Sequence, residues 1–316
     1  MIECVPNFSE GRDEAKVRAI VAAIRSAGVL LLGWESDVDH NRSVVTFAGE
    51  PETVMEGAIR GAGKAAELID LERHEGVHPR VGAADVIPFI PLERATLEDC
   101  ARVAHQAGEE IWRRFAVPVY FYEAAALTPN RKRLEHVRRK GFDGAPPDIG
   151  NVAAHAAAGA SVVGAREILI AFNINLETPE NLETPENLET PENLESRELD
   201  RKDANIARAI ARKIRESSGG FRFVKAMGTY LPSRGISQVS MNLINYAETP
   251  LDRVYEAVAR EAALLGTRVG SSQLVGFIPR GAFEMFPDFF ARADNFDESR
   301  LIETRIATIE SSAGNY

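Results

Sequence analysis

Two histidines that stand four residues apart, with a glutamate directly after the first, form the clearest chemical pattern in the chain. The pattern is His74-Glu75-Gly76-Val77-His78, which matches the zinc-hydrolase motif H-E-x-x-H. In that class of enzyme both histidines lie on one face of a helix and bind a tetrahedral zinc, while the glutamate polarises the metal-bound water. A metal-dependent hydrolase is therefore one hypothesis.

The residues within and after the motif argue against a helix. Gly76 lies inside it, and Pro79 follows His78 directly, which biases the backbone of His78 away from the helical region. No obvious third ligand comes from the other histidines, which are His40, His105, His136 and His155. We expect residues 74–82 to form a loop after a helix, and we rank the zinc hydrolase below the hypotheses that follow.

Composition excludes several classes of partner. The chain has 316 residues, 45% of them hydrophobic, and a net charge of -10 without a basic face, which argues against nucleic acid. No apolar run approaches the ~18 residues that span a bilayer, so we expect no membrane association. Cys4 and Cys100, without C-x-x-C spacing, fit the core of a protein in a reduced, cytoplasmic compartment.

The elements that must position the loop follow a recognisable order. Apolar periodicity in the first part of the chain predicts strands at 2–5, 29–32, 43–47 and 86–90, with helices at 13–26 and 52–69. Pro88 and Pro91 suit an edge or irregular position for the last strand. This βαββαβ order is the split ferredoxin-like motif.

An addition follows, and the second half repeats the first. The addition is predicted to contain a helix begun by Thr96 and Asp99, a strand at 117–122 and a basic helix at 128–140. The second half predicts, in order, a strand at 167–174, a helix at 203–216, strands at 221–230 and 236–246, a helix at 250–265 and a strand at 273–278. The fold class is thus α+β, with two ferredoxin-like α/β sandwich subdomains and a cleft between them as the default ligand site.

A perfect repeat interrupts the second unit. The hexamer Asn-Leu-Glu-Thr-Pro-Glu runs three times from Asn175 to Glu192, and its regular prolines and lack of an apolar face predict a solvated insertion. The expected domains are an N-terminal subdomain, the low-complexity insertion, a C-terminal subdomain and a helical tail, over residues 1–174, 175–200, 201–290 and 291–316.

Polar and titratable residues gather in three segments at strand ends and loops, which are 3–12, 39–42 and 77–91. These segments resemble the formiminotransferase family. The similarity continues through 147–150, 159–166, 217–221, 238–243 and 273–276, in the family's order. It covers about residues 1–290 apart from the repeat.

The resemblance implies a reaction. Members of the family transfer the formimino group from N-formimino-L-glutamate to N5 of tetrahydrofolate, a step of histidine degradation and one-carbon metabolism. It further implies catalysis without a metal, a ligand tunnel between the subdomains and a homodimer. Because only a short acidic helix, predicted at 299–309, remains after residue 290, we expect a monofunctional enzyme.

His78 receives a role from this resemblance. It occupies the histidine of the family's H-P-R-[MV]-G motif, which is the proton acceptor. The chemistry agrees, since N5 must lose a proton as it attacks and the departing nitrogen must gain one, and an imidazole can do both. A nearby carboxylate should stabilise the positive formimino group, and the candidates are Glu35, Asp39 and their neighbour Asp37.

Two further sets complete the expected site. The resemblance places folate on a stretch of small residues that a flat pterin can approach closely: Gly150, Asn151, Val152, Ala153, Ala154, His155, Ala156, Ala157, Ala158 and Gly159. Guanidinium and ammonium groups pair with carboxylates, so the candidates to bind the carboxylates of glutamate and folate are Arg42, Arg80, Arg166 and Lys225.

Two alternatives stay open beside the zinc hydrolase. The same site could transfer a formyl group between 5-formyl-tetrahydrofolate and glutamate. The chain could also be a non-catalytic protein that binds folate or an amino acid on ferredoxin-like domains.

Overall fold

A computed structural model describes residues 1–138, 146–151, 155–177 and 194–313. The hexamer repeat and the middle of the expected folate stretch, Val152 to Ala154, therefore lie largely or wholly outside the described residues. The chain divides into two compact units, one formed by Met1–Ile168 with Thr308–Tyr316 and the other by Leu169–Ala307. We describe each unit by itself.

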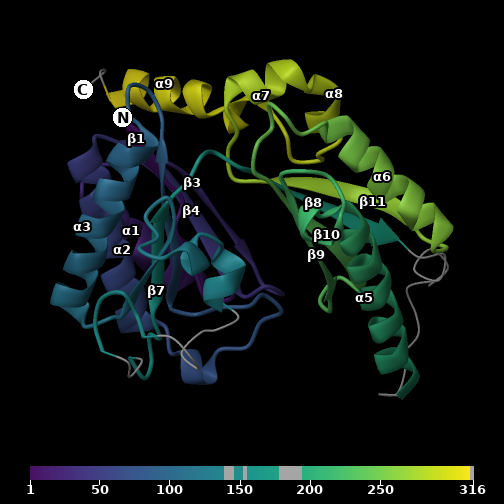
Figure 1. Cartoon of the computed structure of the whole chain (residues 1–316), viewed down its shortest axis with the longest axis horizontal. Helices are drawn as coiled ribbons and strands as arrows, with labels where there is room; N and C mark the ends of the chain where they lie inside the picture. Colours follow the sequence, from purple (N-terminus) through teal and green to yellow (C-terminus); the bar gives the residue numbers. More distant parts are fainter. Residues whose placement is uncertain (139–145, 152–154, 178–193, 314–316) are drawn as a thin grey trace. The chain divides into compact units, whose positions relative to one another are not determined.

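The first unit is built on a seven-stranded sheet (Figure 1). Its strands are β1 (Ile2–Cys4), β2 (Asn7–Phe8), β3 (Leu30–Asp37), β4 (Arg42–Gly49), β5 (Ala84–Pro91), β6 (Val119–Glu123) and β7 (Ser161–Ala165). β4 pairs antiparallel with β1, β2 and β3, and β5 pairs antiparallel with β1 and β2. The addition extends the sheet, because β7 pairs parallel with both β5 and β6.

Three long helices belong to this unit: α1 (Glu14–Arg25), α2 (Pro51–Leu68) and α3 (Leu97–Phe115). Their ends follow local chemistry. The Asp13 side chain accepts from the first turn of α1, and Thr96 and Asp99 form the predicted capping box of α3. Short 3-10 turns, η1 (Leu71–Arg73) and η2 (Pro129–Arg131), lie in the connections.

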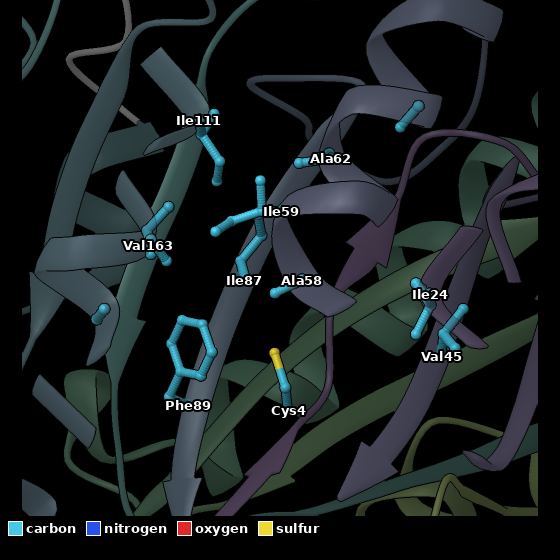
Figure 2. Close-up of a cluster of buried hydrophobic side chains, with 14 of the residues drawn as sticks. Cys4, Ile24, Val45, Ala58, Ile59, Ala62, Ile87, Phe89, Ile111 and Val163 are labelled. Carbon is cyan, nitrogen blue, oxygen red and sulfur yellow. The ribbon is translucent and has the colours of Figure 1, made fainter. Parts of the chain in front are cut away.

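The helices bury one face of the sheet. One buried cluster joins side chains from α1, α2 and α3, among them Ile24, Ile59 and Ile111, to sheet residues that include Val45, Ile87 and Phe89, all labelled in Figure 2. Cys4 and Cys100 are fully buried in this core, as predicted. The opposite face of the sheet carries a smaller apolar cluster, which consists of Val81, Val86, Tyr120, Tyr122, Val137, Ala160 and Val162.

Of the two positions expected for Pro88, an edge or an irregular one, the structure shows the irregular one. Pro88 does not lie at a sheet edge, because β5 runs inside the sheet between β7 and the pair β1 and β2. Pro88 tolerates this position because it faces the interruption between β1 and β2, where its carbonyl accepts a hydrogen bond from the Val5 backbone at 3.3 Å.

The second unit has a four-stranded antiparallel sheet in the order β11-β8-β10-β9. The strands are β8 (Ile170–Glu177), β9 (Val224–Leu231), β10 (Ile236–Leu243) and β11 (Arg268–Val275). The helices are α5 (Leu194–Ile214), α6 (Leu251–Leu264), α7 (Arg280–Met285), α8 (Pro287–Phe290) and the first part of α9 (Ile302–Ala313), which passes into the first unit at Thr308. The 3-10 turns are η4 (Glu216–Ser218) and η5 (Glu298–Arg300). Its core joins Phe172 of β8 to Phe289 and Phe290 of α8.

The predicted fold class is confirmed: both units contain the βαββαβ order, with the first strand lying between the third and the fourth. Several bounds differ. β8 continues to Glu177 and α5 begins at Leu194, both inside the expected insertion, and the basic helix predicted at 128–140 is described as η2 and a short helix at 134–138. The tunnel stays a prediction. Of the described helices, none is long and apolar enough to cross a bilayer.

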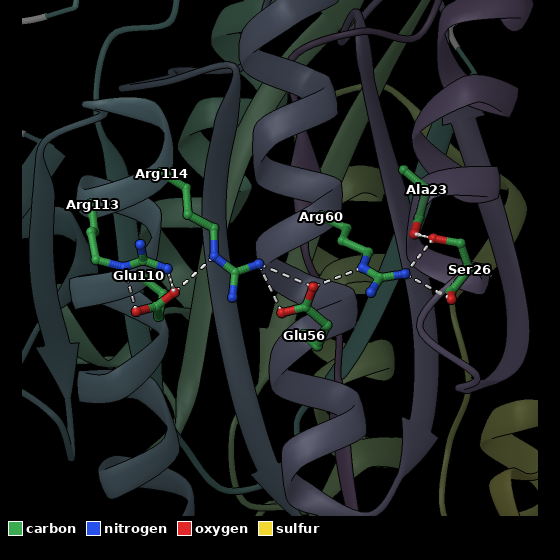
Figure 3. A network of polar contacts seen from close by, with 7 residues as sticks. All are labelled: Ala23, Ser26, Glu56, Arg60, Glu110, Arg113 and Arg114. Carbon is green, nitrogen blue, oxygen red and sulfur yellow. Dashed lines mark hydrogen bonds and ion pairs between the residues drawn. The ribbon is translucent and has the colours of Figure 1, made fainter.

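A chain of charged side chains links the outer faces of the helices in the first unit (Figure 3). Glu56 of α2 accepts from Arg60 at 2.7 Å and from Arg114 of α3 at 2.9 Å, and Arg114 also donates to Glu110 at 2.7 Å. Hydrogen bonding to Arg114 lowers the pKa of Glu56. The stabilisation from Glu56 is thus present above the ordinary carboxyl pKa and is lost as pH falls through the lowered one.

We expect a measurable coupling between Glu56 and Arg114. A double-mutant cycle with Glu56→Gln and Arg114→Gln, measured by urea unfolding at pH 7, should give about 0.5 to 1 kcal/mol, because the pair is half-buried and shared. The matched control is the more exposed pair Glu14 and Arg18 on α1, joined at 2.6 Å, which should give less. Equal coupling in the two cycles would contradict a role for partial burial.

Candidate active site

The loop that carries the H-E-x-x-H string is not helical, as predicted, since η1 ends at Arg73 and residues 74–80 form irregular backbone. His74 is nearly buried, and its Nε2 donates to the Asn41 carbonyl at 2.9 Å. The Asn41 side chain makes a second contact with the loop, in which its Nδ2 donates to the Glu75 carbonyl at 2.9 Å. His74 and Glu75 therefore hold the loop against the turn between β3 and β4.

Two further contacts tighten this docking. The Val77 backbone N–H donates to the Asp39 carbonyl at 3.1 Å. Gly76 is required there, because a Cβ at this position would lie 2.5 Å from the His40 carbonyl oxygen. In the described part of the chain, His, Cys, Asp and Glu side chains form no group of three or more that could hold a metal ion.

His78 has a defined tautomer. Its Nδ1 lies 2.7 Å from the carbonyl oxygen of Pro79. A carbonyl oxygen only accepts, so Nδ1 carries the hydrogen and Nε2 keeps a lone pair. His78 is half-buried, and its ring centroid lies 5.9 Å from that of His40. The arrangement leaves Nε2 as the atom that can take a proton.

Beside His78 lies a buried ionic cluster centred on Asp85. The register between β2 and β5 pairs Asn7 with Val86 and Phe8 with Ala84, so Asp85 is the extra residue of a β-bulge. Its Oδ2 accepts from Arg42 at 2.6 Å and from Arg138 at 2.7 Å.

The cluster sets the electrostatics of the site. Burial alone would raise the pKa of Asp85, but Arg42 and Arg138 outweigh it and hold the pKa well below its usual range. Burial of the imidazole, aided by the same two arginines, lowers the pKa of His78 to about 2. The imidazole is therefore neutral at neutral pH and can accept a proton, and its protonated form would release one readily.

This shift makes a titration of His78 informative. The ring 13Cε1 resonance, assigned with His78→Gln, should stay at its neutral value down to about pH 5, whereas an unperturbed histidine titrates near 6.5. Because protonation is disfavoured only in the folded state, stability should fall as pH drops below about 6.5, and less so in His78→Gln. A midpoint near 6.5 in the folded protein would refute the assigned environment.

Of the candidate carboxylates, Asp39 lies in the turn between β3 and β4, and Glu35 lies on β3 before the turn. Asp39 is 6% exposed in the turn, and its carbonyl anchors Val77 of the His78 loop. Glu35 lies on β3 opposite Val44, so it shares the sheet face of Arg42, two residues along β4. Both acids thus belong to the segments that surround Arg42 and the loop.

The ends of the expected folate stretch are described, although its middle is not. Gly150 has a φ of 97° and packs against Trp112, and Asn151 is exposed. Further along, the His155 Nδ1 accepts from the Ala158 backbone at 3.1 Å, which closes a turn. Gly159 forms a bridge with Gly82, four residues after His78, so the end of the stretch lies beside the loop that carries His78.

The four basic residues expected to bind carboxylates do not lie in one place. Arg42 lies in the Asp85 cluster, and Arg80 donates to the His74 carbonyl within the loop. Arg166 lies at the far end of the sheet, because β7 pairs Ala165 with Phe89, whereas Asp85 precedes the other end of that ladder. Lys225 is on β9 of the second unit.

The sequence analysis assigned no role to two residues of the ionic cluster, Asp85 and Arg138. Asp85 was detectable in principle, since a single acid in the apolar strand Ala84–Pro91 must be buried and paired. Arg138 had no such signal, because the segment around it holds several similar basic residues.

Comparisons with known proteins extend over both units. Residues 1–166 match the family described as the formiminotransferase domain, N-terminal subdomain, and residues 193–311 match the formiminotransferase domain. The glutamate formimidoyltransferase of Streptococcus pyogenes serotype M1 is 36% identical over 312 residues, which cover 96% of this chain and 97% of the relative.

Two other relatives agree. The glutamate formimidoyltransferase of Thermoplasma acidophilum is 38% identical over 318 residues, which cover 97% of each protein. The formimidoyltransferase-cyclodeaminase of Sus scrofa is 38% identical over 315 residues, which cover 95% of this chain and 55% of the longer relative.

Proposed function

The chain belongs to the formiminotransferase family, and from this premise we propose that it transfers the formimino group from N-formimino-L-glutamate to N5 of tetrahydrofolate. The products are 5-formimino-tetrahydrofolate and L-glutamate. The observation that carries the proposal is the similarity to two glutamate formimidoyltransferases over 97% of their length. Tetrahydrofolate is a co-substrate here, and the proposed reaction involves no metal.

His78 is the general base of the proposed mechanism. N5 attacks the formimino carbon, and Nε2 of His78 takes the N5 proton as the new carbon–nitrogen bond forms. The tetrahedral intermediate then collapses, the bond from that carbon to the glutamate nitrogen breaks, and Nε2 gives the proton to the departing nitrogen. The hydrogen bond from Nδ1 to Pro79 supports this role, because it keeps the lone pair on Nε2.

Carboxylates and small residues complete the proposal. Glu35 or Asp39 would stabilise the positive charge of the formimino group, which develops further as the intermediate forms. The stretch from Gly150 to Gly159 would hold the pterin, and the bridge between Gly159 and Gly82 supports its closeness to the His78 loop. Arg80, Arg166 and Lys225 remain candidates for the folate carboxylates. We also propose that the protein is a cytoplasmic homodimer. Light scattering after gel filtration tests whether it is a dimer.

A transfer assay tests the function and separates it from the alternatives. Purified protein with tetrahydrofolate and formiminoglutamate should form 5-formimino-tetrahydrofolate, followed by mass spectrometry. Faster turnover of 5-formyl-tetrahydrofolate with glutamate would favour formyl transfer. Binding of both ligands without turnover of either would favour the non-catalytic protein.

A further inference from the structure

The Asp85 cluster contains an unusual arrangement of charge. Asp85 is 0% exposed, and one of its oxygens, Oδ2, serves both Arg42 and Arg138. The other oxygen, Oδ1, accepts the Val81 backbone N–H at 2.6 Å. One carboxylate thus fixes two guanidinium groups and the loop that follows His78.

The two arginines keep donors for another partner. Arg42 gives its Nε to Asn7 at 3.0 Å and one Nη to Asp85, and Arg138 gives one Nη to Asp85. The Arg138 Nε is buried and meets no acceptor in the part of the chain that is described. A buried donor without an acceptor is costly, and the single carboxylate of Asp85 serves two guanidinium groups.

We propose that Asp85 is a positioning residue that holds Arg42 and Arg138 side by side next to His78, where the two guanidinium groups bind the α-carboxylate of the formiminoglutamate donor. The inference rests on the proposed function and adds the site's anchor for the donor. Two guanidinium groups match one carboxylate, because each can offer parallel N–H donors to its oxygens.

The covalent structure of the donor selects the α-carboxylate. It is attached to the carbon that bears the reacting nitrogen, so it must lie close to the base that protonates that nitrogen. The γ-carboxylate is two methylene groups further away. The carboxylates of the folate tail are separated from N5 by the aminobenzoyl group, which places them away from His78.

The negative charge of the bound formiminoglutamate would also make His78 a stronger base. Burial lowers the pKa of His78, Arg42 and Arg138 lower it further, and Asp85 acts against them; the His40 ring centroid lies 5.9 Å from that of His78. A bound carboxylate would add a negative charge beside the two guanidinium groups and raise the pKa of His78. The free site would then hold a poor base, and the occupied site a better one.

Paired donors test the proposal. N-formimino-4-aminobutyrate is formiminoglutamate without its α-carboxylate, and it retains the other carboxylate. For the native protein, kcat/KM should be about 100-fold lower with this analogue. In Asp85→Asn the preference should shrink to about 10-fold or less, chiefly through a raised KM for formiminoglutamate. Asp85→Glu, which keeps the charge, should restore part of it.

A second variant protects the test against misfolding. Arg138→Gln leaves Arg42 and Asp85 paired and should also lower the preference by about 10-fold. Arg133→Gln, an exposed change in the same segment, is the matched control and should keep the native preference. If Asp85→Asn and Arg138→Gln lose activity equally towards both donors, so that the preference is unchanged, the positioning role is wrong.

Calorimetry separates this inference from the proposed function. L-glutamate should bind the native protein more tightly than 4-aminobutyrate, and the difference should shrink in Arg138→Gln but not in Arg133→Gln. This result without any formimino transfer would refute the proposed function and keep the anchor. Transfer with equal binding of the two amino acids would keep the function and refute the anchor.

Discussion

Replacement of His78 by alanine is expected to lower kcat for formimino transfer by about 10²- to 10⁴-fold, the range that a positioned general base contributes. The loss should appear in kcat because the imidazole acts on the proton at N5 and then on the departing nitrogen. Steady-state assays with both substrates varied measure it, and circular dichroism checks the fold.

The control is His136→Ala, since His136 is exposed and lies outside the loop. It should retain native turnover. A His78→Ala protein that turns over within about threefold of the native rate would show that another group moves the proton.

Replacement of Gly82 by alanine is expected to lower the free energy of unfolding by about 3 kcal/mol. A Cβ on Gly82 would lie 1.9 Å from the Ala160 carbonyl oxygen, which belongs to backbone and cannot move aside cheaply. The Gly82 carbonyl also accepts from Ser9 at 2.8 Å, so a shift would disturb that contact. Thermal unfolding should show a melting temperature lower by about 6 to 12 °C.

Gly281→Ala is the matched control, because the nearest atom to its Cβ would be the Tyr246 hydroxyl at 3.7 Å, an ordinary contact. Its position in α7 makes alanine neutral or stabilising, by about 0.5 to 1 kcal/mol. If both variants melt at the native temperature, the close approach of Gly82 and Ala160 does not exist in solution.

Periodic features were predictable from the sequence. The amphipathic spacing of α1 and α2 and the capping box at Thr96 identify helices, and amphipathic spacing recurs in α6. Strand bounds were less accurate: Arg42 begins β4 and Asp37 ends β3, although both are polar, because cross-strand pairing extends a sheet beyond its apolar run.

The residues of the candidate site were likewise predictable only where a local pattern marks them. His78 was identifiable as a candidate because it belongs to a local motif. Asp85 and Arg138 were not assigned, because their contact joins residues 53 positions apart through a bulge that no local pattern specifies. For a similar reason the sequence left open whether Pro88 lies at an edge or at an irregular position, since its place depends on an interruption between other strands.

The partner of His78 Nδ1 is a main-chain oxygen, that of Pro79. Since every residue type supplies this oxygen, no side-chain truncation can delete it, and a scan of alanine variants would find no second member of a catalytic pair. The backbone path of the loop therefore sets the tautomer of His78. A substitution that alters this backbone path would then lower activity as the loss of a reacting group does, although it removes no reacting group.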